Sequence, residues 1–292
     1  MNKVLNKEGI YSALITPYDS DGEVSIKSLI DIINYEKDLG VEGFYCCGSS
    51  GEGLLLSDAE RMKIVEAVAE YAESLPYIVH TGALSTRSSI KLSKHAQEHG
   101  AVAVSMIPPI YYKYTQQEIE KNYLNVADKI DIGMIVYNIP QFTNISFNQN
   151  SPLLKDDRII GIKNTSNNLY ELERMKKAYP DKILFNGFDE IYYSSLAAGA
   201  TATIGTTINI IPNIYKKIRE NFKTGNVKEA QYYQTKANDF IEALVNNSVF
   251  PATKYCLDLL GFMAGPCREP FSPLTTKQKE DVKIALDKVK EI

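Results

Sequence analysis

The sequence predicts an α/β fold, a TIM (β/α)8 barrel with a helical appendage at its C-terminal end. Short apolar runs alternate with amphipathic helical stretches up to about residue 223. Eight such runs occur, and eight parallel strands close this kind of barrel. After residue 223 only helical patterns follow, and the length of 292 residues suits one barrel with an appendage.

Each predicted strand is a short apolar run that suits a buried position in a parallel sheet. The eight runs are YSALI (11–15), GFYCC (43–47), YIVHT (77–81), AVAVSMI (101–107), IGMIVYN (132–138), IIGIKN (159–164), KILFNG (182–187) and ATATIG (200–205).

Helical patterns lie between the strands. Several begin with Ser or Thr, which cap helix N-termini, and two run into a glycine that suits a C-terminal cap. The segment after the fifth strand, 143–156, is short and turn-rich and gives the weakest helical pattern. The clearest patterns cover 25–40, 57–73, 86–100, 115–129 and 168–180.

The predicted division is a barrel over residues 1–223 and a helical extension over 224–292, with helices near 225–247, 251–263 and 275–292. No proline- or glycine-rich linker separates the two parts. We therefore expect the extension to pack on the barrel and not to fold alone.

Composition favours a small-molecule substrate. The formal charge is −4, and Lys and Arg are scattered along the chain, which argues against nucleic acid as the main partner. The N-terminal residues lack the apolar stretch of a secretory signal. The uncharged segment 191–215 is too rich in Ser, Thr, Asn, Gly and Pro to span a membrane. We expect a cytoplasmic protein without a membrane partner.

The sequence leads us to expect neither a disulfide framework nor a zinc site. The four cysteines include an adjacent pair and no CxxC, so we expect reduced, mostly buried thiols. HAQEH (95–99) matches the H-x-x-E-H pattern of inverted zinc peptidases. It lies on a predicted exterior helix, where two histidines near the C-terminus are ordinary, so zinc chemistry is not expected.

Unusual residues collect at the C-terminal ends of the predicted strands, where barrel enzymes place their active sites. GSSGE (48–52) follows the second strand, Tyr137 ends the fifth, Lys163 ends the sixth, GFDE (187–190) follows the seventh and GTT (205–207) follows the eighth. All five fall on one face.

Lys163 ends a strand that is otherwise almost free of polar side chains. Loss of hydration at a barrel mouth disfavours an ammonium ion, and a neutral amine can attack a ketone. The alternative is an ion pair with Asp or Glu. Pyridoxal phosphate could also use such a lysine, but no phosphate cradle is evident, so no cofactor is expected.

The other motifs each have an ordinary alternative. Tyr137 could relay protons beside Lys163, or its ring could simply pack in the barrel. GSSGE could bind an anion through backbone N–H groups, or form a plain turn. The acids of GFDE could accept hydrogen bonds from substrate hydroxyls, or complement a helix dipole.

Taken together, five motifs resemble a known family. GSSGE, YNIP (137–140), GIKNTS (161–166), NGFDE (186–190) and IGTTIN (204–209), in this order and spacing, resemble the N-acetylneuraminate lyase and dihydrodipicolinate synthase superfamily of class I aldolases. The resemblance covers nearly the whole chain.

Within the superfamily, NGFDE is similar to the lyase branch. Dihydrodipicolinate synthases usually carry an arginine shortly after the YN-P motif, where this chain has Phe142. The resemblance therefore implies reversible cleavage of N-acetylneuraminate to N-acetylmannosamine and pyruvate. An aldolase for another 2-keto-3-deoxy sugar acid and a catalytically silent sugar-acid sensor remain as alternatives.

The resemblance also implies roles for single residues. Lys163 would form the Schiff base, Tyr137 would move the proton, and Ser49 and Ser50 would hold the carboxylate. Thr165 would line the pocket. The sugar hydroxyls would be bound by Gly187, Asp189, Glu190, Gly205 and Thr206.

The assembly implied by the family is a homotetramer built as a dimer of dimers. Tyr111, in PIYYK, matches a tyrosine that reaches into the neighbouring subunit's site in this family.

Overall fold

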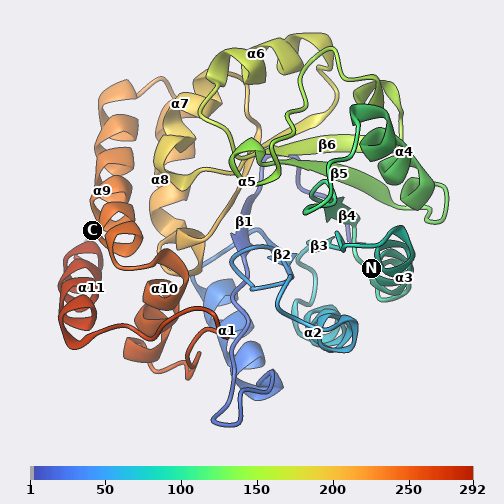
Figure 1. The fold of residues 1–292 in the computed structure, drawn as a ribbon. Coiled ribbons are helices and arrows are strands. Elements are labelled where there is room, and N and C mark those ends of the chain that lie inside the picture. The colour runs from blue at the N-terminus through green and yellow to red at the C-terminus, as the bar shows by residue number, and fades with distance from the viewer. Residues whose placement is uncertain (1–2, 292) are drawn as a thin grey trace.

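Eight parallel strands close into a barrel in chain order, which confirms the predicted fold class (Figure 1). The computed structural model describes residues 3–291. The strands are β1 (Ile10–Ala13), β2 (Gly43–Cys46), β3 (Tyr77–His80), β4 (Ala103–Met106), β5 (Gly133–Asn138), β6 (Ile159–Asn164), β7 (Ile183–Asn186) and β8 (Ala202–Gly205).

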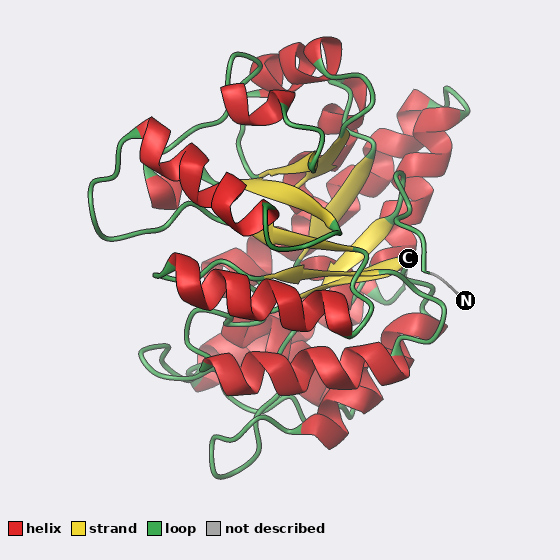
Figure 2. Cartoon of the chain, turned by 90° about the vertical axis from the view of Figure 1, so that its right-hand side faces the viewer, coloured by secondary structure: helices red, strands yellow, loops and turns green. Residues whose placement is uncertain are grey.

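Helices surround the strands, as Figure 2 shows from the side. Those that follow a barrel strand are α1 (Ile26–Asp38), α2 (Asp58–Tyr71), α3 (Thr86–Glu98), α4 (Gln116–Ala127), α5 (Pro140–Thr143), α6 (Leu169–Ala178), α7 (Tyr192–Ala197) and α8 (Pro212–Lys223). Three further helices complete the chain, α9 (Val227–Asn246), α10 (Val249–Leu259) and α11 (Thr276–Val289).

Helix ends follow the capping chemistry of the sequence. Ser57 and Thr115 each form a capping box with the glutamate three residues on. Gly40 and Gly100, just after α1 and α3, have φ of +80° and +85°. Glycine adopts this left-handed conformation without steric cost, so both predicted C-terminal caps are confirmed.

Element boundaries differ most where turn chemistry interrupts the pattern. The predicted strand over 101–107 shortens to Ala103–Met106, and the one over 11–15 moves to Ile10–Ala13. Segment 143–156, the weakest helical pattern, holds only a 3-10 turn at Pro152–Lys155. A helix of one turn, α5, precedes it.

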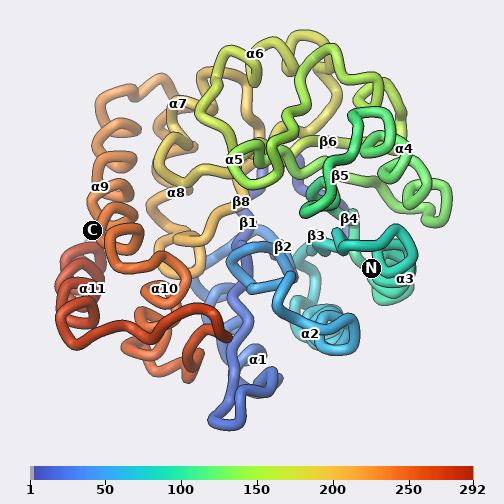
Figure 3. Tube along the Cα trace, viewed as in Figure 1, coloured from blue at the N-terminus to red at the C-terminus, as the bar shows by residue number. Residues whose placement is uncertain are grey.

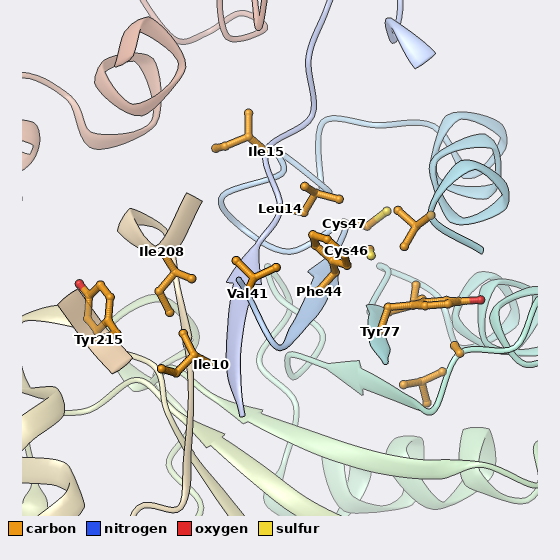
Figure 4. Packing of buried hydrophobic residues seen from close by; sticks show 14 of the residues in the cluster. Ile10, Leu14, Ile15, Val41, Phe44, Cys46, Cys47, Tyr77, Ile208 and Tyr215 are labelled. Carbon is orange, nitrogen blue, oxygen red and sulfur yellow. The ribbon is translucent and has the colours of Figure 1, made fainter. Parts of the chain in front are cut away.

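The core has two layers. Side chains inside the barrel, including Tyr45, Tyr137 and Phe185, form one cluster. The other cluster fills the space between strands and helices, and Figure 4 shows part of it around β1 and β2. Alternate residues of each strand face the two layers, so both faces of the sheet are buried.

The C-terminal helices pack on one side of the barrel (Figure 3). Helix α9 contacts α8, α10 and α11. The predicted division after residue 223 falls at the C-terminal end of α8 and stays a prediction.

A buried ion pair ties the C-terminal helices to the loop after β2. The Nζ of Lys254, on α10, lies 2.7 Å from Oε1 of Glu52, and both side chains are 1% exposed or less. Lys254 also donates to the carbonyl oxygen of Pro266, and Glu52 accepts from the backbone N–H of Arg268. Glu52 of the GSSGE motif therefore holds the appendage and does not face the barrel mouth.

Two expectations about composition can be checked in residues 3–291. All four cysteines are free, and three of them are buried, as predicted. None of the helices that the structure describes is both long and apolar enough to cross a membrane.

Removing one charge of the buried pair should destabilise the protein far more than removing both charges together. Lys254→Met leaves the carboxylate of Glu52 buried without its cation, so we expect a loss of about 3–5 kcal/mol in the free energy of unfolding. Lys254→Met with Glu52→Gln removes both charges and should recover much of that loss. Urea denaturation measures both.

Lys283→Met is the matched control, because Lys283 and Asp287 form an ion pair with both side chains about 60% exposed. It should cost less than about 1 kcal/mol. A Lys254→Met cost no larger than this would contradict the anchoring role of the pair.

Candidate active site

A cavity of about 220 Å³ opens at the C-terminal ends of the barrel strands. Its walls come from the strand ends, the loops that follow them, and helices α9 and α10. Every predicted site residue lines it except Gly205 and Tyr111. The lining residues are Ala13, Ser49, Ser50, Tyr137, Ile139, Gln141, Phe142, Lys163, Thr165, Gly187, Phe188, Asp189, Glu190, Ile204, Thr206, Thr207, Ile241, Val245, Val249 and Phe250.

Lys163 and Tyr137 lie side by side on neighbouring strands. Their Cα positions are register partners in the β5–β6 pair. The Nζ of Lys163 lies 4.1 Å from the ring centroid of Tyr137 and 4.3 Å from that of Tyr45. Lys163 is 4% exposed, so its amine is held at an almost dry position that opens onto the cavity.

Lys163 does not form the ion pair with Asp or Glu that was the alternative explanation for its position. None of the ion pairs found within residues 3–291 involves it. The carboxylate of Asp189 is near enough for its pKa to be affected by Lys163 but is not within ion-pair distance. The amine is therefore available to a ligand.

Aromatic groups surround the amine. The ring centroids of Tyr45, Tyr137 and His80 lie 6.2 to 6.4 Å apart, and Tyr137 meets each of the other two rings edge to face. Burial, followed by the charges of Arg61 and Lys163, holds the pKa of His80 well below its ordinary value. His80 is therefore neutral at physiological pH, and its Nε2 accepts from the backbone N–H of Ile107 at 3.2 Å.

Asparagine side chains fix the ends of the two strands. The Nδ2 of Asn138 donates to Oδ1 of Asn164 at 2.7 Å, and Oδ1 of Asn138 accepts from the backbone N–H of Phe147. Both amides are buried. Because each asparagine follows a site residue directly, this bond holds Tyr137 and Lys163 in their relative positions.

Asp189 is oriented by the loop after β8. Its Oδ2 accepts from the backbone N–H of Thr207 at 2.8 Å and from the hydroxyl of Thr207 at 2.7 Å. Tyr215 lies 2.6 Å from that hydroxyl and donates to it, because the hydroxyl proton is already given to Asp189. Burial raises the pKa of Asp189, and the bonds from Thr207 offset part of the effect.

Two polar atoms of the cavity wall are buried and without a protein partner. They are Oδ1 of Asp189 and Oγ1 of Thr165, and neither has a hydrogen bond within the part of the chain that the structure describes. A buried polar atom that stays unpaired costs free energy, and most such atoms in native proteins have a partner.

The two glycines of the predicted site give these atoms their space. A Cβ on Gly205 would lie 1.7 Å from Oδ1 of Asp189, and a Cβ on Gly187 would lie 2.0 Å from Oγ1 of Thr165. Gly205 itself does not line the cavity. Its contribution is that it has no side chain, which leaves room for the carboxylate of Asp189.

The loop after β2 meets the loop after β8. The hydroxyls of Ser50 and Thr206 are 2.7 Å apart. Ser50 is buried and Ser49 is exposed, while the hydroxyl of Thr16 holds the loop by donating to the carbonyl oxygen of Gly51. Thr206 is therefore adjacent to the serine pair.

Glu190 is half-buried in the cavity wall, and burial raises its pKa, to which the charge of Asp189 adds. The loop that carries it is held by α9. Gln234 donates to the carbonyl oxygen of Asp189, and Asn238 donates to that of Glu190.

Tyr111 lies outside the cavity. It is 89% exposed, has φ of +82°, and contacts Tyr112 edge to face at 5.0 Å between ring centroids. Within this one chain it touches none of the other predicted site residues that line the cavity.

The sequence analysis missed the apolar wall of the cavity. Ile241 and Val245 of α9, with Val249 and Phe250 of α10, close one side of it. The amphipathic pattern of 225–247 predicts a buried face, but it cannot show that the end of this face reaches the barrel mouth. Tyr45 was missed as well, because both faces of β2 are apolar.

Comparisons with known proteins agree with the geometry. The model of the family described as "Dihydrodipicolinate synthetase family" matches residues 6–289. The chain is 38% identical to an N-acetylneuraminate lyase of Rhizobium meliloti, covering 90% of this chain and 89% of the relative. It is 36% identical to an N-acetylneuraminate lyase of Fusobacterium nucleatum, covering 94% and 97%.

Solved structures match over almost the whole length. CdNal from Clostridium difficile, in complex with mannosamine, has a TM-score of 0.95 at 31% identity and covers 98% of this chain and 100% of its own. A Ruminococcus gnavus sialic acid aldolase, solved as a catalytic lysine mutant, has a TM-score of 0.94 at 29% identity, covering 99% and 98%.

The contact between Gly205 and Asp189 can be tested by a double-mutant cycle. We expect Gly205→Ala to cost about 1–3 kcal/mol in the free energy of unfolding, because the new methyl group overlaps the carboxylate. In an Asp189→Ala background the methyl group has room, so the same substitution should cost much less. Equal costs in the two backgrounds, measured by urea denaturation, would show that Asp189 is not the group that excludes a side chain at position 205.

Proposed function

The chain belongs to the dihydrodipicolinate synthetase family, and from that premise we propose that it is a class I aldolase that reversibly cleaves N-acetylneuraminate to N-acetylmannosamine and pyruvate. One observation carries the proposal. The amine of Lys163 is 4% exposed, free of any carboxylate within ion-pair distance in residues 3–291, and next to the phenol-bearing ring of Tyr137. A dehydrated amine beside a proton-transfer group is what a Schiff-base mechanism requires.

The choice of substrate rests on the relatives and on the cavity. Both curated relatives above are named N-acetylneuraminate lyases. Phe142 lines the cavity mouth where dihydrodipicolinate synthases usually carry an arginine, and no arginine is among the lining residues. A substrate with a second carboxylate would therefore lack its cation.

Lys163 supplies the nucleophile. Its neutral amine adds to the C2 carbonyl of the open-chain 2-keto acid, and loss of water from the carbinolamine leaves a protonated iminium. The iminium withdraws electrons from the C3–C4 bond.

Tyr137 moves the proton. It accepts the proton of the C4 hydroxyl as the C3–C4 bond breaks, so that N-acetylmannosamine leaves as an aldehyde and the bonding electrons form an enamine on Lys163. Protonation of the enamine at C3 and hydrolysis of the iminium then release pyruvate and restore the amine.

The serine pair holds the carboxylate of the keto acid. Ser49 and Ser50, with neighbouring backbone N–H groups, offer donors on the loop after β2. The bond between Ser50 and Thr206 keeps one of these hydroxyls in place. Thr206, which we also assign to the sugar chain, thereby connects the two parts of the substrate site.

The polyhydroxylated chain of the sugar extends toward the loops after β6 and β7. Asp189 and Thr165 line the cavity there, and Oδ1 of Asp189 and Oγ1 of Thr165 have no hydrogen-bond partner among residues 3–291. Glu190 adds a half-buried carboxylate. We assign Gly187 and Gly205 to this site because they keep space for these side chains.

Two alternatives differ in a measurable way. An aldolase for a shorter 2-keto-3-deoxy sugar acid would release no N-acetylmannosamine from N-acetylneuraminate and would cleave the shorter acid. A silent sugar-acid sensor would need neither an amine nucleophile nor a proton relay, and the adjacency of Lys163 and Tyr137 argues against it.

We further propose a cytoplasmic homotetramer in which Tyr111 reaches the site of a neighbouring subunit. The support is the exposed aromatic pair of Tyr111 and Tyr112, 89% and 69% exposed in the single chain. Large aromatic side chains in contact on a surface are typical of an interface. Light scattering gives the mass, and a monomer would contradict the assembly.

Borohydride trapping tests the nucleophile. Reduction in the presence of pyruvate should leave a stable covalent adduct on Lys163, located by peptide mass spectrometry. Lys163→Arg should abolish it, since guanidinium stays protonated and cannot add to a ketone. Lys182→Arg, at the opposite end of the barrel, is the matched control and should keep it. An adduct that survives in Lys163→Arg would reassign the nucleophile.

Kinetics of Tyr137→Phe test the proton relay. Loss of the phenol should lower kcat for N-acetylneuraminate cleavage by about 10² to 10⁴, the usual range for a lost acid–base group. Tyr45→Phe is the matched control, because it keeps the second ring against Lys163 and loses only a bond to Ser105. It should change kcat by less than about tenfold. Near-normal turnover in Tyr137→Phe would mean that water or the substrate carries the proton.

A further inference from the structure

Three metal-binding side chains gather on the outside of the barrel, away from the cavity. They are Glu66 of α2 with His95 and His99 of α3, and their ligand atoms all lie within 4.8 Å of one another. Helices α2 and α3 pack side by side (Figure 1). The two histidines belong to the HAQEH motif, which the proposed reaction does not use.

The helix brings the two imidazoles together. Residues four apart lie one turn apart on the same face of an α-helix. The ring centroids of His95 and His99 are 4.1 Å apart, with 30° between the ring planes. The Nε2 of His95 lies 3.0 Å from Oε1 of Glu66, so the carboxylate of the neighbouring helix is already in contact with this pair.

The backbone prepares His99 as a ligand. Its Nδ1 lies 2.9 Å from the carbonyl oxygen of His95. A carbonyl oxygen can only accept, so Nδ1 carries the proton and the lone pair is on Nε2. Histidines that bind metals usually donate their second ring N–H to a carbonyl or carboxylate in this way, which fixes the ring for coordination.

We propose that Glu66, His95 and His99 form a site for a divalent first-row transition metal ion, foremost Zn²⁺. The ligands are Nε2 of each histidine and a carboxylate oxygen of Glu66, with water in the fourth position of a tetrahedron. Imidazole selects such ions over Mg²⁺ and Ca²⁺, which prefer oxygen. A carboxylate oxygen only accepts, so Nε2 of His95 carries a proton in its contact with Glu66, and this proton leaves when Nε2 coordinates the ion.

This site differs from the one that the H-x-x-E-H pattern describes. In that pattern the glutamate is Glu98, which is absent from the cluster; the acidic ligand here is Glu66 from another helix. The ion also lies at the far end of the barrel from the cavity, since α3 ends at Glu98 and leads into the start of β4. It therefore joins α2 to α3 and takes no part in the reaction.

Zinc titration of the tag-free full-length chain tests the site. The chain has only three histidines, and the third, His80, is 3% exposed inside the barrel. Isothermal titration calorimetry with Zn²⁺ in reducing buffer should show one ion per chain. His99→Gln and Glu66→Gln should each weaken binding by about 10-fold or more, while Glu98→Gln on the same helix and Cys267→Ser should not change it.

Thermal unfolding provides the second measurement. Zn²⁺ at about 100 times its dissociation constant should raise Tm by several degrees in the unmodified chain and not in His99→Gln. Kinetic constants for the keto acid should be the same with and without Zn²⁺. Unchanged zinc affinity in His99→Gln, or equally tight binding of Mg²⁺, would overturn the proposal.

Discussion

The site depends on one constraint, a lysine amine held in a nearly dry barrel mouth without a carboxylate to neutralise it. A buried ammonium usually pairs with Asp or Glu, because an uncompensated charge in the interior is costly. Lys254, elsewhere in this chain, shows that ordinary solution, since Glu52 meets it at 2.7 Å. Lys163 is instead placed against the rings of Tyr45 and Tyr137. The fold thus gives one buried lysine a carboxylate partner and places the other against two aromatic rings.

The C-terminal helices complete the cavity, although the barrel strands carry Lys163 and Tyr137. Helix α9 holds the loop after β7 through Gln234 and Asn238, and its last turns line the cavity. The Lys254–Glu52 pair connects α10 to the loop that carries Ser49 and Ser50. Both loops assigned to substrate binding are therefore held from outside the barrel, so loosening the appendage would disturb them together.

The sequence predicted the barrel well because its signals are local and repeated. Eight apolar runs, most of them followed by a helical pattern, leave few other topologies, and the strand-end rule then places Lys163, Tyr137 and the loop motifs on one face. Contacts between distant segments were not predictable in this way. The partner of Glu52 is some two hundred residues along the chain, and nothing in GSSGE distinguishes its buried glutamate from a ligand-binding one. For the same reason the sequence could not show that Val249 and Phe250 form a wall of the cavity. It also could not show that Glu66 lies beside the two histidines, because they belong to a different helix.

The unpaired atoms of the cavity explain why its glycines and its acid occur together. Oδ1 of Asp189 and Oγ1 of Thr165 are buried without a hydrogen-bond partner in residues 3–291, and an unpaired buried polar atom costs free energy. A methyl group at Gly205 or Gly187 would overlap one of these atoms, so a glycine at each position lets the acid and the threonine keep their places. Burial raises the pKa of Asp189 because charge is disfavoured there, and Thr207 restores part of the stability of the carboxylate. A hydroxyl that donates a hydrogen bond to this carboxylate would stabilise its charged form further, so the wall around Asp189 favours a ligand that carries hydroxyl donors.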